Sequence, residues 1–192
     1  MAVMLAFQPS IPEGRIRLSL EEYLELPNDG KRYQILDGEL DVTPAPNVRH
    51  QRVSRKLEWH LVNGLERSGL GEVFYAPIDV VLDRTSIVQP DLVFVSRARA
   101  GIVGTLRIEG APDLVVEILS PSSRRTDVIV KSELYARFGV LHYWIVDPDV
   151  DRVEIYRLAE RAYELVQTGQ APAELAVEVP GKLSLPLGEI FA

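Results

Sequence analysis

Apolar residues recur along the chain at two different spacings, which separate helical from extended segments. Between positions 47 and 68 the aliphatic residues Val53, Leu57, Leu61 and Leu65 return every four positions, as on one face of a helix. Gly69 follows and can end that helix in a left-handed conformation. The spacing predicts a long helix over 47–68 with one buried face.

Shorter apolar runs predict the strands. Residues 33–42 form two such runs around Asp37-Gly38, a dipeptide typical of a tight hairpin turn. Residues 114–119 are apolar on both faces and therefore predict a central strand. Further strands are predicted over 73–82, 92–95, 143–146 and 152–158.

The remaining segments complete a mixed α/β plan. Ser19 and Glu22 have the spacing of a capping box, which predicts a short helix at 19–24. A second long helix should open at Ser122 or Ser123 and end at Phe138 before Gly139. We expect an extended arm at the N-terminus, a loop at 97–111, and edge strands with a tail over 163–192. The sum is a sheet with two main helices against it.

Two carboxylates lie in apolar surroundings at the ends of predicted strands. Glu117 has aliphatic neighbours on both sides, and Asp91 follows Pro90 at the start of the 92–95 strand. A buried carboxylate is unfavourable unless it is paired, hydrogen-bonded or bound to a metal. If the two strands are neighbours, Asp91 and Glu117 could together hold a divalent cation. A structural ion pair is the alternative for Glu117.

A lysine on the second long helix is the natural partner of Glu117. Lys131, Leu134, Tyr135 and Phe138 fall on one helical face, and its apolar members predict that this face packs on the sheet. Lys131 is thereby directed inward, where it needs an acidic partner. It could otherwise extend along the helix toward water.

The order of five segments resembles a known family. YQILDGEL (33–40), NVRHQRV (47–53), VQPDLVFV (88–95), APDLVVEILSPSS (111–123) and KSELYARFGVLHYWIVDP (131–148) stand in sequence. Together they resemble the Uma2-like (DUF820) endonucleases of the PD-(D/E)XK, or restriction-endonuclease-like, superfamily. The resemblance covers residues 19–158 and implies a restriction-endonuclease-like α/β core with a central mixed sheet flanked by helices.

The resemblance also implies a set of site residues. Asp91 and Glu117 would bind Mg²⁺ or Mn²⁺, with the Ile118 carbonyl as a further ligand. Lys131 would replace the lysine that the superfamily motif places where this chain has Leu119. His50 would assist at the metal or the phosphate, and Glu39 is a further acidic candidate. The substrate-binding candidates are the arginines Arg52, Arg124 and Arg125. Gln34 departs from the family pattern, where an acidic residue is more usual.

Composition limits the function classes. The 192 residues suit one domain, predicted as an arm over 1–18 and a single domain over 19–192. The absence of cysteine excludes thiolate zinc sites and cysteine nucleophiles. A net charge of −7 argues against tight non-specific binding to nucleic acid. With neither a signal peptide nor a run of about 18 apolar residues, we expect a cytoplasmic protein without a membrane span.

The sequence therefore favours a metal-dependent nuclease acting on nucleic acid, with DNA preferred to RNA. The exposed edge strands expected late in the chain favour a homodimer, which would suit the cutting of two strands. Two alternatives stay open at this stage. One is a catalytically inactive homologue that binds nucleic acid or serves in assembly, and the other is a hydrolase of a small phosphoester.

Overall fold

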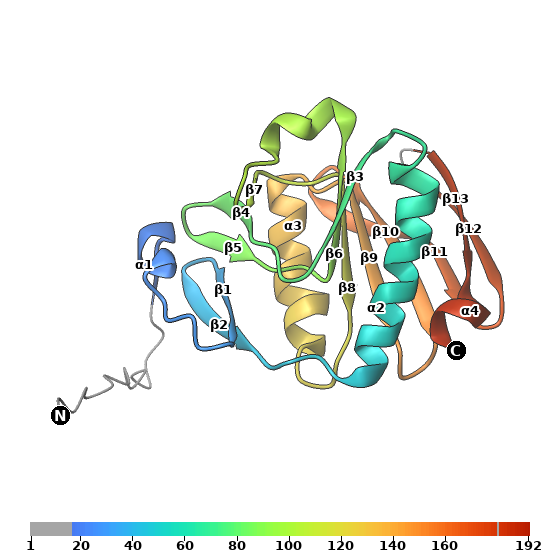
Figure 1. The fold of residues 1–192 in the computed structure, drawn as a ribbon, viewed down its shortest axis with the longest axis horizontal. Coiled ribbons are helices and arrows are strands. Elements are labelled where there is room, and N and C mark those ends of the chain that lie inside the picture. The colour runs from blue at the N-terminus through green and yellow to red at the C-terminus, as the bar shows by residue number, and fades with distance from the viewer. Residues whose placement is uncertain (1–16, 180) are drawn as a thin grey trace, which may run out of the picture.

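A six-stranded mixed sheet forms the centre of the protein (Figure 1). The computed structural model describes residues 17–179 and 181–192, so nearly all of the predicted arm lies outside the described residues. The strand order is β11–β10–β9–β8–β6–β3. Their bounds are β3 Gly71–Tyr75, β6 Leu92–Ser96, β8 Leu114–Ile118, β9 His142–Asp147, β10 Arg152–Ala159 and β11 Ala162–Gln170. Only β8 and β9 pair in parallel, which makes the sheet mixed and confirms that 114–119 supplies a central strand.

The first predicted helix covers one face of this sheet. It consists of α2 (Val48–Leu61) and the π-helical segment η1 (Val62–Glu66), and the Asn47 side chain caps its start by accepting from the His50 N–H. A hairpin of β12 (Glu174–Val179) and β13 (Gly181–Pro186) and the helix α4 (Leu187–Phe191) pack beside it. The predicted tail is thus a buried helix.

The second predicted helix covers the other face. The π-helical segment η3 (Thr126–Lys131) runs into α3 (Ser132–Phe138), and Gly139 ends it at φ 81° as predicted. A smaller sheet, ordered β2–β1–β5–β4–β7, lies beside α3 (Figure 1). Its strands are β1 Arg32–Leu36, β2 Glu39–Thr43, β4 Val80–Asp83, β5 Ser86–Val88 and β7 Ile108–Glu109. The helix α1 (Leu20–Leu24) carries the predicted capping box.

Strand alternation divides the interior into two cores. Leu92, Phe94 and Val116 point toward α2, whereas Val93 and Val115 point toward α3. By the same alternation Asp91 and Glu117 belong to the α3 side of the sheet. The predicted fold class is confirmed. The two carboxylates lie where β6 and β8 approach α3.

One predicted strand was wrong. Residues 73–82 form two strands in two different sheets, since β3 belongs to the central sheet and β4 to the smaller one. The chain turns between them at Pro77, which has no N–H to donate and cannot continue a paired strand. The predicted loop at 97–111 likewise contains a 3₁₀ segment, η2 (Arg97–Ile102), and β7. No helix in the described ranges is long and apolar enough to cross a membrane.

The backbones of β3 and β6 approach each other closely at Gly71. A Cβ added to Gly71 of β3 would lie 2.1 Å from the Val95 carbonyl oxygen and 2.7 Å from the Ser96 Cα of β6. Neither is a flexible side-chain end, so the strands would have to separate. We expect Gly71→Ala to lower the free energy of unfolding by about 1–3 kcal/mol, measured by urea denaturation. Gly101→Ala is the control, because nothing lies within 4 Å of its added Cβ; equal stability of the two variants would contradict this.

Candidate active site

The pairing of β6 with β8 brings the two predicted metal ligands together. Leu92 pairs with Val116 in an antiparallel register, so Asp91 and Glu117 follow one step further along the same ladder. The Ile118 N–H donates to Asp91 Oδ2 at 2.8 Å. Asp91 is 5% exposed and Glu117 2%. The sequence-based expectation that these strands are neighbours is therefore confirmed.

Asp91 is held as a carboxylate by donors. His50 Nε2 lies 3.1 Å from Asp91 Oδ2, and the Arg32 guanidinium lies 3.7 Å from Oδ1. Burial alone would raise the pKa of Asp91. The hydrogen bond and charge of His50, the Ile118 N–H and Arg32 outweigh burial and hold the pKa below its ordinary value. Asp91 is therefore anionic at neutral pH.

The surroundings of Glu117 shift its pKa in the opposite direction from that of Asp91. Both of its hydrogen bonds are made to Oε1, from Lys131 Nζ at 3.1 Å and from the Tyr135 hydroxyl at 2.7 Å. Burial, together with the charges of Asp127 and Asp91, raises the pKa of Glu117 to about 8 despite the nearby lysine. An additional cation near this carboxylate would relieve the repulsion.

Lys131 is fixed between two carboxylates. Its Nζ lies 3.0 Å from Asp127 Oδ1 and 3.1 Å from Glu117 Oε1, and the residue is 3% exposed. Burial would lower the pKa of Lys131, but Glu117, Asp127 and Asp91 raise it above the ordinary value. The lysine therefore stays protonated at neutral pH and acts as a charge and a hydrogen-bond donor. The prediction that it faces inward toward Glu117 is confirmed.

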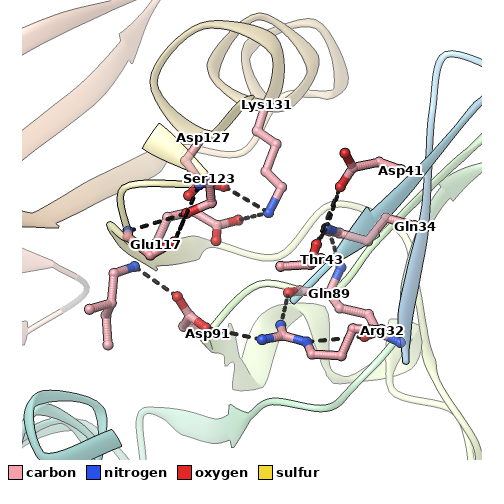
Figure 2. A network of polar contacts seen from close by, with 12 residues as sticks. Arg32, Gln34, Asp41, Thr43, Gln89, Asp91, Glu117, Ser123, Asp127 and Lys131 are labelled. Carbon is pink, nitrogen blue, oxygen red and sulfur yellow. Dashed lines mark hydrogen bonds and ion pairs between the residues drawn. The ribbon is translucent and has the colours of Figure 1, made fainter. Parts of the chain in front are cut away.

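These side chains line a pocket of about 270 Å³. The loop between β2 and α2 forms one wall, including Pro44 and Pro46, and the turn at Ser120–Ser123 forms another. Figure 2 shows Lys131 reaching down from its helix toward Glu117, with Asp91 and Arg32 on the opposite side. The lining holds three carboxylates, of Asp91, Glu117 and Asp127, against the two cations Arg32 and Lys131.

A hydrogen-bond network centred on the Gln34 amide supports the rim of the pocket. The Gln34 side chain donates to Thr43 at 2.8 Å and Asp41 at 3.3 Å, and accepts from the Gln89 N–H at 2.9 Å. Arg32 in turn donates to the Gln89 carbonyl at 2.7 Å (Figure 2). Position 34, where the family pattern favours an acid, is therefore occupied by a structural amide that orients the segment carrying Arg32.

The other residues singled out from the sequence lie at different distances from this centre. His50 lines the pocket, and its Nε2 side faces Asp91 while its buried Nδ1 has no hydrogen-bond partner in the described structure. Ile118 also lines it. Arg52 lines the neighbouring groove along α2. Arg124 pairs with Asp147 at 2.8 Å. Neither Arg124 nor Arg125 lines the pocket, and Glu39 lies on β2, also outside its lining.

Three members of the site were not predicted. Asp127 precedes Lys131 by four residues on the same helical face, a spacing that could have identified the pair. Tyr135 was assigned to the packed face, but its hydroxyl donates to Glu117. Arg32 reaches Asp91 only because β1 folds against β5, next to β6 in the chain, and no local pattern signals that contact.

The residues present fit a hard divalent cation. Residues 17–179 and 181–192 contain no group of three or more acidic or histidine side chains arranged to hold a metal by themselves. Mg²⁺ nevertheless keeps several waters and is commonly bound through one or two carboxylates. Asp91 and Glu117 offer such oxygens in one pocket, where three carboxyl groups and two basic side chains meet. We therefore treat the pair as a candidate Mg²⁺ or Mn²⁺ site.

Comparison with known proteins identifies a family and a related fold. Residues 20–188 match the profile of the Uma2 family, described as "Putative restriction endonuclease". The fold is similar to a crystal structure from Anabaena variabilis, described as "a putative nuclease belonging to DUF820". That match has a TM-score of 0.74 and 22% sequence identity, and covers 91% of this chain and 97% of the other. No curated protein matches the chain.

Proposed function

The chain belongs to the Uma2 family, and from that premise we propose that it is a metal-dependent nuclease that hydrolyses phosphodiester bonds in nucleic acid. The observation that carries the proposal is the pocket in which Asp91, Glu117 and Lys131 converge from β6, β8 and the η3–α3 helix. A protein that needed only a structural ion pair would have no reason to add a third buried carboxylate to it.

Asp91 and Glu117 would hold the cation, with the Ile118 carbonyl as a further proposed ligand. When bound, a divalent cation neutralises charge on a phosphate and makes a water more acidic. The two ligands are prepared differently, because Asp91 is already ionised whereas Glu117 is protonated over part of the neutral range. Cation binding would therefore release a proton from Glu117.

Lys131 and Arg32 would stabilise the negative charge that develops on the phosphate oxygens. Lys131 is held protonated by Glu117 and Asp127, so it can donate a hydrogen bond but cannot accept a proton near neutral pH. Arg32 lines the same pocket from the opposite side. His50 contacts Asp91, and its proposed part is to orient that carboxylate.

The substrate class and assembly follow the sequence-based expectations. We propose DNA as the preferred polymer, a homodimer as the assembly and the cytoplasm as the location. The outer edge of the central sheet at β11 offers a place for a second copy, since Leu165 and Val166 are exposed there. These parts of the proposal can fail without affecting the chemistry of the pocket.

A nuclease assay tests the chemistry directly. We expect the wild type to cleave at least one of single- and double-stranded DNA and RNA in Mg²⁺ or Mn²⁺ and to be inactive in EDTA. Asp91→Ala and Glu117→Ala, each verified to be folded, should lose about 10³-fold or more of the rate, because each removes a charged ligand at the reacting phosphate. Arg161→Ala is the control, since this exposed arginine lies against β11 outside the pocket.

Three outcomes would contradict the proposal in different ways. Cleavage that survives EDTA and both substitutions would place the activity elsewhere or in a contaminant. Metal-dependent activity on nucleotides but on no polymer would favour a small-phosphoester hydrolase. Binding of nucleic acid without any cleavage would favour the inactive homologue.

A further inference from the structure

Three hollows lie next to one another along one side of α2 and share lining residues. The pocket at Asp91 shares Arg32, Pro46 and His50 with a second hollow of about 830 Å³ between α2 and the end of β3. That second hollow shares Arg55 and Glu58 with a third, of about 800 Å³, beside the second half of α2 and α4. We name the second and third hollows together the α2 groove.

The α2 groove presents unpaired cations. Arg52 and Arg55 are exposed on successive turns of α2. Neither makes an ion pair with an acidic side chain in the part of the chain that the structure describes, in contrast to Arg49, which pairs with Asp151. The acidic side chains that line the α2 groove are those of Glu58, Asp91 and Glu189. The basic side chains of its lining are Arg32, Arg52, Arg55, Lys56 and Arg67, so they outnumber the acidic ones along the groove.

The same groove presents two exposed aromatic side chains. Tyr75, at the end of β3, is 61% exposed and lines the second hollow. Trp59 is 60% exposed and lines the third, where the ring of His60 packs perpendicular to it at 4.8 Å between centroids. An exposed tryptophan is unusual, because burying its ring is strongly favourable. Both rings flank the stretch of α2 that carries Arg55.

Cations and aromatic rings along one track match the chemistry of a single nucleic-acid strand. Phosphates follow the cations, while unpaired bases stack on the rings whatever their sequence. In a duplex the base faces are covered by neighbouring pairs, so exposed rings would have nothing to stack on. The groove also borders the pocket where the phosphodiester would be cleaved, since Asp91 and His50 line both.

We propose that the α2 groove binds the single-stranded segment of nucleic acid adjoining the scissile phosphate. Arg52 and Arg55 contact its phosphates, and Tyr75 and Trp59 stack on its bases. This inference rests on the proposed nuclease function for placing the bound segment next to the scissile phosphate. The binding itself requires neither metal nor catalysis.

Tryptophan fluorescence can report the binding directly. Trp59 is exposed and Trp144 is fully buried in the central sheet, so the fluorescence change on stacking comes from Trp59. In EDTA, where no cleavage occurs, titration with a short single-stranded DNA oligonucleotide should quench the emission to saturation. Trp59→Phe should abolish the quench, and the same sequence as a duplex should bind at least about tenfold more weakly.

Substitutions then separate the contributions. Trp59→Ala and Tyr75→Ala should each weaken single-strand binding about tenfold, measured by fluorescence anisotropy of a labelled oligonucleotide. Arg52→Ala and Arg55→Ala should each weaken it and reduce its salt dependence, by about 0.7 in the slope of log affinity against log salt for each phosphate lost. Arg161→Ala should change neither. All these side chains are exposed, so the melting temperatures should stay equal.

The outcomes of this experiment and of the nuclease assay are distinguishable. Saturable quenching without cleavage under any metal condition would support the groove and overturn the nuclease proposal. Cleavage without quenching, or alanine variants that bind like the wild type, would overturn the groove. Duplex binding as tight as single-strand binding would overturn the assignment to single strands.

Discussion

Glu117→Gln is expected to abolish metal-dependent cleavage and, at the same time, to raise the melting temperature. The amide keeps the shape of the side chain and an oxygen that can accept from Lys131 and Tyr135, which now contact Oε1. It removes one of three buried carboxylates that repel one another in the pocket. Lys131 keeps Asp127 as its partner at 3.0 Å. Loss of a metal ligand should cost about 10³-fold or more in rate.

The stability gain should depend on pH in a defined direction. Burial first, and the neighbouring carboxylates next, raise the pKa of Glu117 from 4.5 to about 8 in the folded protein. The folded state therefore holds this proton more tightly than the unfolded state. Ionisation of Glu117 lowers stability progressively as the pH rises through this interval, and the cost is complete above pH 8. In thermal unfolding in EDTA, Glu117→Gln should have a slightly higher melting temperature than the wild type at pH 5. At pH 8.5 the difference should be a few degrees or more.

Two comparisons check this reading of Glu117. In the wild type, the rise in melting temperature on adding Mg²⁺ should be larger at pH 8.5 than at pH 6, because the cation competes with the proton. Glu117→Gln should show no such rise. A variant that is less stable than the wild type at every pH would mean that Glu117 is chiefly the partner of a structural ion pair, and would favour the inactive homologue.

Much of the site could be predicted because its residues stand out in the local sequence pattern. Glu117 interrupts an apolar strand, and Lys131 interrupts an apolar helical face, so each is a buried charge that needs a partner. That Asp91 and Glu117 share a face depends on the pairing register of β6 with β8, which only the structure shows. The periodicities predicted a mixed α/β fold with two main helices, and the order of the family segments implied a restriction-endonuclease-like core.

What could not be predicted depends on contacts between distant segments. The apolar pattern of 73–82 is that of one strand, and only the packing of two sheets shows that β3 and β4 part at Pro77. Arg32 reaches Asp91 across 59 positions of sequence because β1 pairs with β5. The α2 groove likewise needs Tyr75 from β3 beside Arg55 from α2, and neither segment signals the other.

Lys131→Met is expected to be the most destabilising single change in the pocket. Methionine has a similar length but no charge, so Glu117, Asp127 and Asp91 would lose the cation that lies among them. Removing one partner of a buried ion pair typically costs about 3–5 kcal/mol. Urea denaturation in EDTA at pH 8 measures this loss. Lys31→Met is the matched control, because its ion pair with Asp29 is as short, at 2.9 Å, but exposed, so its loss should lower the free energy of unfolding far less.

The response of this variant to metal separates the two readings of the pocket. If Asp91 and Glu117 form a metal site, removing the competing ammonium group should let Mg²⁺ bind more tightly, so the cation should restore part of the lost stability. The recovery should exceed the stabilisation that Mg²⁺ gives the wild type, while cleavage stays low because the charge at the phosphate is missing. Adding Glu117→Gln to Lys131→Met should remove the recovery. A loss of stability that Mg²⁺ does not change would identify the lysine and its carboxylates as a structural network alone, since the unpaired charges would then have no affinity for the cation.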